Sequence, residues 1–261
     1  MAARLYARIV GAPAGRPGAQ TRQASWKAPV ADPFDITIPG VTAAADEHAV
    51  LVRSAEPLAL LSSAVVGGGL CRARAIVNLH VDKDYDGHCP EDDLAAFAAR
   101  HGVEAPFVGL MTAACTDHSR VATEARDGLA VAAVVSMGLS NTTCAGVTPP
   151  LGAGPSPGTI NAILLIDGRL SEAAMVNAVI CATEAKALAL AAWDVRAPQG
   201  EPASGTSTDA VVIACTGRGP GLSYAGPATT AGWLVARTVR GAMEQICREK
   251  IERDGGRRLG W

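Results

Sequence analysis

Small polar side chains flank three predicted strands, and residues of these types could together catalyse attack on a carbonyl carbon. Ser140 and Asn141 follow one apolar run, Thr159 and Asn161 begin a second, and the segment Gly205–Ala210, which reads GTSTDA, precedes a third. Hydroxyl and amide groups collected at strand ends can stabilise an oxyanion and orient a water molecule. The same residue types also form ordinary turns, so a purely structural role for the aspartate in GTSTDA is the alternative.

Two charged residues lie in a long apolar segment that is predicted to form a helix over about residues 171–192. At 100° per residue, Glu184 and Lys186 point to nearly opposite sides of this helix, so they cannot pair with each other. Because the segment is apolar almost all round, we expect it to be buried on most sides, where a charge needs a partner from another element. Either the two residues form structural ion pairs, or the helix is less buried, or one or both line a pocket.

One segment, from His80 to Cys89, is rich in residues that could bind a metal ion. Its histidines and aspartates match neither a zinc spacing nor a calcium loop, so it is predicted to be a solvated loop, and no catalytic metal is expected. Cys115 or Cys144 could act as a nucleophile with a histidine such as His118, but a buried or inert cysteine is the more common case. The sequence contains no GxxxxGK[ST], HExxH or GxSxG motif and predicts no cofactor.

The composition narrows the class of protein. The chain has 261 residues and a formal net charge of -2, which gives no electrostatic case for binding nucleic acid or an anionic membrane. Its seven cysteines are widely spaced and form no CxxC pair, as expected in a reducing cytosol. No run approaches the roughly 20 apolar residues that a membrane span requires, so a cytoplasmic location is predicted. The oligomeric state is left open, with a homo-oligomer among the alternatives.

Apolar runs and turn residues predict an α/β fold of the mixed α+β kind, in a single domain with a mixed β-sheet. A helix is predicted to begin at Pro90 and to end near Gly102, and an amphipathic C-terminal helix is predicted over about residues 230–254. Residues 1–34 are predicted to be a loose N-terminal extension, and residues 35–261 a single domain. The predicted strands cover residues 58–66, 75–81, 107–112, 129–137, 160–166 and 211–214.

Several motifs, taken in order along residues 50–245, resemble those of the adenosylcobinamide amidohydrolases, the CbiZ family. The longest is GTIN, which continues into ILLIDGRLSEAAMV and is followed by TEAK and then by GTSTDA. The other motifs are the triple glycine Gly67, Gly68 and Gly69, Asn78 with Val81 and Tyr85, GLMTAA with Thr112, GLSN with Ser140 and Asn141, and Tyr224 with Gly226.

The resemblance implies hydrolysis of the amide that joins aminopropanol to a propionate side chain of the corrin ring, which yields cobyric acid in cobamide salvage. The partner implied is a small molecule, a corrinoid or another amide. In this interpretation Asp209 and Glu184 are candidate acid–base groups, and Lys186 and Thr206 would hold or polarise the carbonyl. The candidate substrate-binding residues are Gly67, Gly68, Gly69, Asn78, Thr112, Ser140, Asn141, Thr159, Asn161 and Tyr224.

Three positions depart from the family pattern. Cys144 stands where a basic residue is expected, and Ala228 and Trp233 stand where a histidine and a glutamate are expected. Because alanine has no polar side-chain group and tryptophan only one N–H, a pocket near Tyr224 is expected to be drier and narrower than cobinamide requires, unless this segment lies at a rim. The alternatives to cobinamide hydrolysis are a related enzyme for another, smaller or more apolar molecule, and a corrinoid-binding protein without turnover.

Overall fold

The structure is a computed structural model that describes residues 32–85, 88–150 and 158–253. Its main feature is one nine-stranded mixed sheet. The nine strands of this sheet are β1 (Asp32–Pro33), β2 (Val41–Ala45), β3 (Ala49–Ser62), β4 (Gly69–His80), β5 (Val108–Thr112), β6 (Arg120–Arg126), β7 (Leu129–Met137), β9 (Ile160–Asp167) and β12 (Ala210–Cys215). Two separate two-stranded sheets are formed by β8 (Thr142–Thr143) with β11 (Gly205–Thr206), and by β10 (Arg169–Leu170) with β13 (Gly221–Leu222). The helices are α2 (Pro90–Arg100), the 3-10 helix η1 (Thr116–His118), α3 (Glu172–Ala192) and α4 (Thr230–Arg253).

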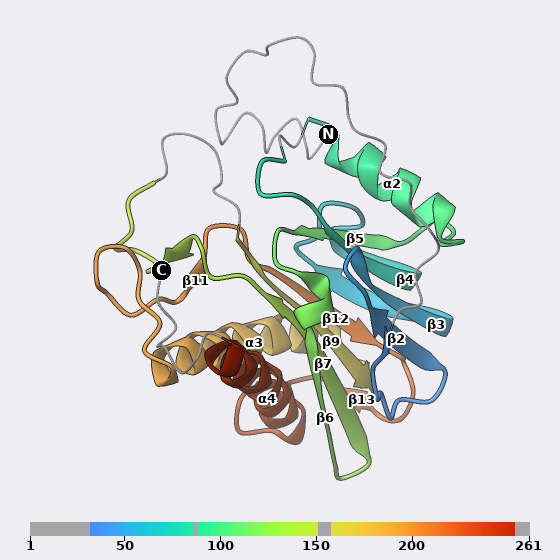
Figure 1. Cartoon of the computed structure of the whole chain (residues 1–261). Coiled ribbons are helices and arrows are strands. Elements are labelled where there is room, and N and C mark those ends of the chain that lie inside the picture. The colour runs from blue at the N-terminus through green and yellow to red at the C-terminus, as the bar shows by residue number, and fades with distance from the viewer. Residues whose placement is uncertain (1–31, 86–87, 151–157, 254–261) are drawn as a thin grey trace.

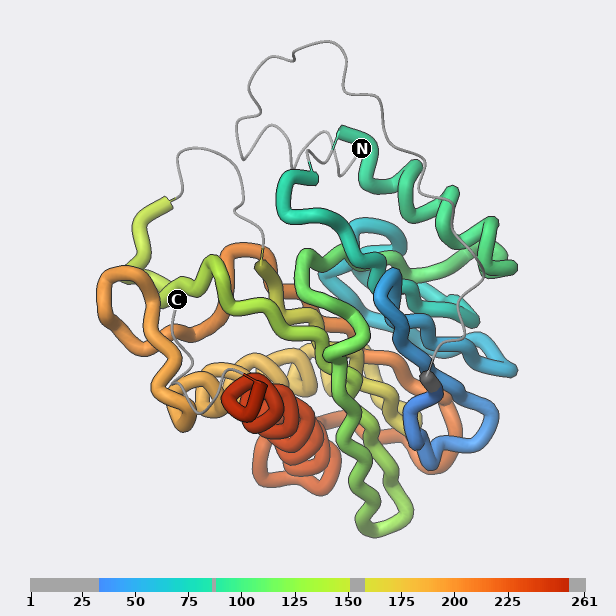
Figure 2. The backbone as a smooth tube through the Cα atoms, viewed as in Figure 1, coloured from blue at the N-terminus to red at the C-terminus, as the bar shows by residue number. Residues whose placement is uncertain are grey.

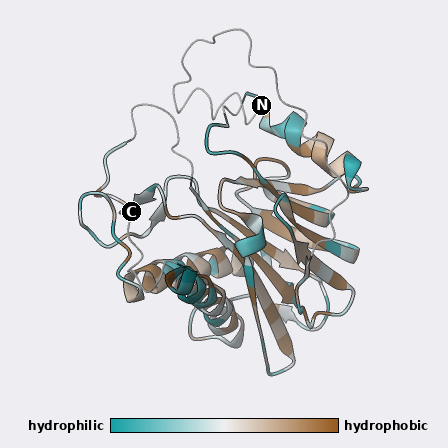
Figure 3. Ribbon diagram, viewed as in Figure 1, coloured by the Kyte–Doolittle hydropathy of each residue, from teal (hydrophilic) through white to brown (hydrophobic). Residues whose placement is uncertain are grey.

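The strands form two layers, and helices cover the outer side of each. Helix α2 lies on one side of the strands and helices α3 and α4 lie on the opposite side (Figure 1). The backbone trace shows the same order of layers (Figure 2). The strands are mostly hydrophobic in both layers, whereas polar residues colour much of α4 (Figure 3). The α/β class with a mixed sheet is confirmed.

The two layers are parts of one sheet that folds over at β3. Strand β3 pairs with β4 along one side, and along its other side first with β2 and then with β12. Its register with β4 shifts between Arg53 and Leu58, and a bulge of this kind bends a strand. As a result β4 and β5 lie over β9 and β7, so that Ile76 and Leu110 share a buried cluster with Ile163.

The alternation of side chains gives each layer a second, outer face. On β9, Ile163 belongs to the cluster between the layers, whereas its neighbour Leu164 belongs to the cluster under α3 and α4. On β4, Val77 packs outward with Leu94 and Phe97 of α2. Three hydrophobic clusters thus hold the two strand layers and their helices together.

The predicted strands and helices are all present, although some of their limits differ. Strand β3 begins at Ala49, well before the predicted start at Leu58, because its bulge interrupts the apolar pattern. Strand β6 was not predicted, since it has no apolar run and none of its residues is fully buried. Residues 1–31 of the predicted extension lie outside the described part of the chain, whereas Asp32 and Pro33 form β1 and pair with β2.

Helix α3, expected to be buried on most sides, has one exposed face. Val176, Ile180 and Leu188 on that face are 51%, 47% and 59% exposed. The sequence could not reveal this face because no polar stripe marks it. Among the described residues, α3 is also the one helix that is long and apolar enough to cross a membrane, contrary to the expectation that no segment is. Half of the apolar window is buried inside the protein, and the core helix of a globular protein meets the same criterion of length and composition.

An ion pair between Arg120 on β6 and Glu249 on α4 gives a test of how the sheet and this helix are joined. Arg120 Nε donates to Glu249 Oε1 (2.6 Å), and this bond is the main cause that holds the pKa of Glu249 below its usual value. A carboxyl group whose pKa is lower in the folded than in the unfolded state stabilises the fold at pH values above its unfolded pKa, which is about 4.3 for glutamate. This stabilisation is lost as the pH falls through the folded-state pKa. Because both side chains are partly exposed, Glu249→Gln should lower the free energy of unfolding by only about 0.5–1 kcal/mol at pH 7.

Chemical denaturation measures the difference in the free energy of unfolding between the wild type and the variant. The measurement is made at pH 7 and at steps below the unfolded pKa of about 4.3, and the difference should shrink as the pH falls. Glu244→Gln is a matched control, because Glu244 is on the same helix and pairs with Arg248 in a more exposed i,i+4 bridge. A difference for Glu249→Gln that does not change with pH would contradict the assignment.

Candidate active site

The three small polar segments predicted from the sequence meet at one edge of the sheet. Strands β9 and β12 run parallel, with Asn161 opposite Ala210. Strand β7 is antiparallel to β9, with Met137 opposite Ile160, so β7 ends where β9 begins. The residues gathered here, called the strand-end cluster below, are Asn141, Thr159, Lys186, Thr206, Ser207, Thr208 and Asp209.

Hydrogen bonds join the three segments directly. The side-chain amide of Asn141 donates to Ser207 Oγ (2.7 Å), and Thr159 Oγ1 donates to the carbonyl of Thr208 (2.6 Å). Thr208 Oγ1 donates in turn to the carbonyl of Gly158 (2.9 Å). The antiparallel pairing of β8 with β11 extends the same connection. Segments far apart in the sequence are therefore fixed against one another.

Asp209 lies at the centre of the cluster, and hydrogen-bond donors surround its carboxylate. Oδ1 accepts from the backbone N–H of Ile160 (3.0 Å) and from Thr206 Oγ1. Oδ2 accepts from the backbone N–H of Thr206 (3.1 Å) and from Lys186 Nζ. A carboxylate offers about four lone-pair sites, so all are in use. The side chains of Lys186 and Asp209 are each only 13% exposed, and removing either one would leave a nearly buried charge.

Gly205 provides the space that this ion pair occupies. A Cβ at this position would lie 2.3 Å from Asp209 Oδ2 and 2.6 Å from Lys186 Nζ. Among the described residues Asp209 is the only acceptor for Lys186, and an ammonium group has three N–H donors. Two N–H donors of Lys186 are thus free to hydrogen-bond a ligand.

Glu184 lies apart from the strand-end cluster. It is exposed to solvent, and the helix geometry puts it nearly opposite Lys186 around α3. The structure therefore brings together three of the four predicted catalytic residues, Thr206, Asp209 and Lys186, and does not bring Glu184 to them. Tyr224, which is 59% exposed, also lies outside the cluster.

A buried polar network lies between the two strand layers behind the cluster. The Asn161 amide donates to Asn78 Oδ1 (2.8 Å) and to the carbonyl of Met111 (2.9 Å). The Asn78 amide donates to Ser136 Oγ (2.9 Å), which is 2.7 Å from Ser119 Oγ. The four side chains are at most 1% exposed, so they position the strand ends from inside the fold. Sequence reasoning missed the two serines, because a single serine in an apolar strand or a loop carries no signal.

The other predicted binding residues lie around the same edge. Gly67 and Gly68 lie in the turn between β3 and β4, Gly69 begins β4, and Gly67 and Gly69 have positive φ angles of 68° and 83°. This turn follows Ser63, whose backbone N–H donates to the carbonyl of Val211 at the start of β12 (3.1 Å). Thr112 is buried and accepts from a backbone N–H, whereas Ser140 is exposed.

Cys144, the first departure from the family pattern, directly follows β8 at this edge of the sheet and is partly buried. Its backbone N–H donates to Thr148 Oγ1 (2.9 Å). Cys115, the other cysteine considered as a nucleophile, is exposed rather than buried and lies beside His118.

Ala228 and Trp233 line a pocket of about 190 Å³ at the opposite end of the sheet. Thr230 in this pocket donates to Asp127 Oδ2 (3.0 Å), in the turn before β7. The strand-end cluster, in contrast, lies beyond the other end of β7. A strand of this length spans about 25 Å, so the pocket is remote from Asp209. The guanidinium of Arg126 lies 5.3 Å from the centre of the Trp233 ring. A cation and two threonines also line this pocket, so its lining is not purely apolar.

Comparisons with known proteins agree with the motifs in the sequence. A family profile described as adenosylcobinamide amidohydrolase matches residues 37–255. An adenosylcobinamide amidohydrolase from Methanosarcina mazei is 32% identical over 183 residues, which cover 67% of this chain and 82% of that protein. One from Halobacterium salinarum is 33% identical over 205 residues, which cover 75% of this chain and 83% of that protein.

Among solved structures, a Pyrococcus horikoshii protein aligns over 93% of this chain and 91% of its own, with 12% identity and a TM-score of 0.45. The family profile and the two curated relatives each cover most of the chain. The chain belongs to the CbiZ family of adenosylcobinamide amidohydrolases.

Proposed function

We propose that this protein hydrolyses the amide bond of adenosylcobinamide and so releases aminopropanol and cobyric acid in cobamide salvage. Family membership supports the substrate class. The observation that supports the chemistry is a single constellation, in which the Asp209 carboxylate is held between the Thr206 hydroxyl and the Lys186 ammonium group. A nucleophile hydrogen-bonded to a base, which a third group orients, is the arrangement of covalent amide hydrolases.

The bonding of Asp209 favours Thr206 over a water molecule as the attacking group. A water molecule could reach the carboxylate only by displacing one of the donors that already fill its lone pairs. Thr206 Oγ1 is one of these donors, so its proton can pass to Asp209 through an existing hydrogen bond. In the proposed first step Thr206 Oγ1 bonds to the amide carbon and its proton moves to Asp209.

Lys186 completes the reaction scheme. Its two remaining N–H donors can stabilise the oxyanion of the tetrahedral intermediate. The C–N bond then breaks, Asp209 returns the proton to the departing nitrogen, and aminopropanol leaves. Water hydrolyses the resulting Thr206 ester by the same route and gives the free carboxylate of cobyric acid. Asn78 and Asn161, which are buried, act in this proposal by fixing the strand ends and do not touch the substrate.

Turnover of adenosylcobinamide tests the function directly. We expect aminopropanol and cobyric acid to appear in equal amounts by mass spectrometry, with kcat/KM of about 10⁴ M⁻¹s⁻¹ or above. Binding of the corrinoid without product would instead indicate a corrinoid-binding protein, and the absence of both would indicate another substrate.

Substitutions of the constellation test the mechanism. Asp209→Asn and Thr206→Val should each lower kcat by at least about 100-fold, because each removes the proton transfer. Thr206→Ser should keep part of the activity, and a trapped ester on Thr206 should be detectable by peptide mass analysis.

The far ends of β9 and β12 provide matched controls. Thr216 Oγ1 donates to Asp167 Oδ1 (2.8 Å), which is a threonine–aspartate pair of the same kind at the other edge of the sheet. Asp167→Asn and Thr216→Val should leave kcat within a few-fold of the wild type. Near-wild-type kcat in Asp209→Asn, with the fold intact by circular dichroism, would reduce Asp209 to a turn residue.

The space at Gly205 gives a third test. Gly205→Ala should abolish most activity while the strands persist, because a Cβ would displace the Lys186–Asp209 pair. Gly221→Ala is the control, since a Cβ there meets nothing closer than 3.7 Å and the glycine needs no positive φ. Equal kcat values for the two variants would show that the ion pair does not need this space.

A further inference from the structure

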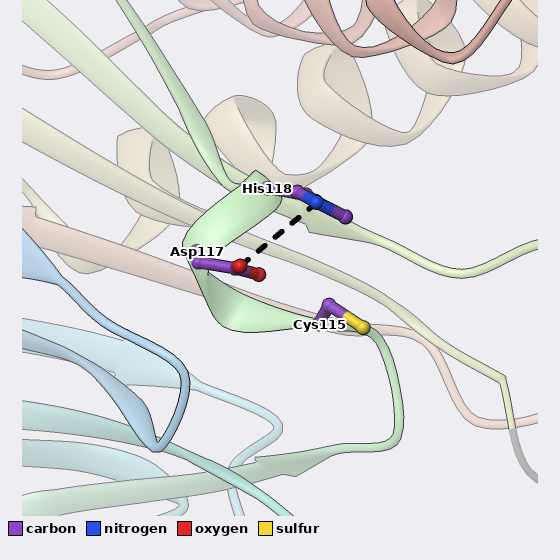
Figure 4. Close-up of side chains that lie close together, drawn as sticks. All are labelled: Cys115, Asp117 and His118. Carbon is purple, nitrogen blue, oxygen red and sulfur yellow. Dashed lines mark ion pairs between the residues drawn. The ribbon is translucent and has the colours of Figure 1, made fainter. Parts of the chain in front are cut away.

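The short helix η1 presents three potential metal ligands on one surface. Cys115, Asp117 and His118 each offer a ligand atom, and these atoms lie within 4.8 Å of one another (Figure 4). A 3-10 helix has three residues per turn, so residues three apart lie on the same side. Cys115, the N-cap of η1, is three residues before His118, and the ligand atoms of the two residues lie close together.

Two buried hydroxyls fix η1 to the rest of the fold. Thr116 follows Cys115, Ser119 follows His118, and both are fully buried. Thr116 Oγ1 donates to the carbonyl of Asp46 (2.6 Å), and Ser119 Oγ lies 2.7 Å from Ser136 Oγ. The backbone N–H of His118 also donates to the carbonyl of Cys115 (3.2 Å). The ligand-bearing backbone is thus held before any ion binds, which lowers the cost of binding.

A positive side chain beside η1 is already neutralised. Arg120 forms the ion pair with Glu249 described above, and its Nη1 donates to the carbonyls of Asp117 (3.2 Å) and Ser119 (2.7 Å). The guanidinium group therefore clamps the backbone of η1 and is compensated by a carboxylate. It does not oppose the entry of a cation as an unpaired arginine would.

We propose that Cys115, Asp117 and His118 bind one divalent transition-metal ion of the zinc class. Thiolate, carboxylate and imidazole are the three ligand types that zinc takes, at about 2.0–2.3 Å each. Ligand atoms around a tetrahedral ion lie about 3.5 Å apart, so the side chains need to close by about 1 Å through rotation. Three protein ligands leave the fourth position open to a water molecule or another donor.

The proposed metal site is independent of the proposed hydrolysis, because none of its ligands belongs to the strand-end cluster. Calcium and magnesium do not suit it, since a thiolate is a poor ligand for such hard ions. The chemistry of the ligands therefore favours a divalent transition-metal ion over a hard cation, and cobalt(II) serves as the spectroscopic substitute for zinc.

Cobalt(II) titration of the full chain, without a histidine tag and with a non-thiol reductant, tests this site. We expect one ion per chain, with the thiolate-to-cobalt charge-transfer absorption of a bound cysteine and the d–d bands of a four-coordinate ion. Zinc added afterwards should remove both signals. The zinc affinity is measured by competition with a chromophoric indicator.

Single substitutions assign the ligands. Cys115→Ser should remove the charge-transfer band. Both Cys115→Ser and His118→Ala should weaken zinc binding by at least about tenfold, because the loss of even a residue that only hydrogen-bonds to a ligand costs about 10–100-fold in metal affinity. Cys89→Ser is the matched control, because Cys89 is another exposed cysteine outside the cluster, and it should bind as the wild type does. Wild-type binding by Cys115→Ser, an equal loss in Cys89→Ser, or no saturable binding of either ion would each overturn the proposal.

Discussion

The ion pair between Lys186 and Asp209 is the interaction on which the strand-end cluster depends. One carboxylate receives donors from the start of β9, from β11 and from α3, so it ties a helix on one side of the sheet to two strand ends. Such a pair is expensive to desolvate, and only well-placed additional hydrogen bonds offset that cost. The backbone N–H groups of Ile160 and Thr206 supply them, and Gly205 provides the space.

The same interaction links stability to chemistry. A carboxylate with no lone pair to spare is a poor partner for an incoming water molecule, but it can still take a proton from a donor that is already in place. The cluster is rigid for the same reason that it favours Thr206 as the nucleophile in the proposed mechanism. Rigid placement of reacting groups is also what gives intramolecular reactions their rate advantage.

Much of this edge could be predicted from the sequence, because its signals are local. Glycine, threonine, asparagine and aspartate next to apolar runs indicate strand ends, and β9, β12 and β7 lie where those runs predict them. Lys186 could be expected to need a partner, since the helix phase separates it from Glu184. These inferences need only the chain's immediate neighbourhood and the period of a helix or strand.

The remaining features depend on contacts between distant segments. The fold of the sheet at the β3 bulge, which places Asn78 over Asn161, has no local signal in the sequence. The exposed face of α3 is equally hidden, because its apolar residues continue all round the helix and only the final packing decides which are covered. Ser119 and Ser136 join the buried polar network only when β4, β7 and β9 are brought together.

The positions of Ala228 and Trp233 change what the departures from the family pattern imply. A smaller or more apolar substrate would follow only if these residues lined the space around the reacting amide. They lie instead next to the turn before β7. The guanidinium groups of Arg126 and Arg237 lie 5.3 Å and 5.4 Å from the centre of the Trp233 ring. Each guanidinium group is within the distance at which a cation is attracted to the face of an aromatic ring. Changes at these two positions therefore alter the surface beside the β6–β7 turn, whereas in the proposed mechanism Thr206, Asp209 and Lys186 govern the reacting amide.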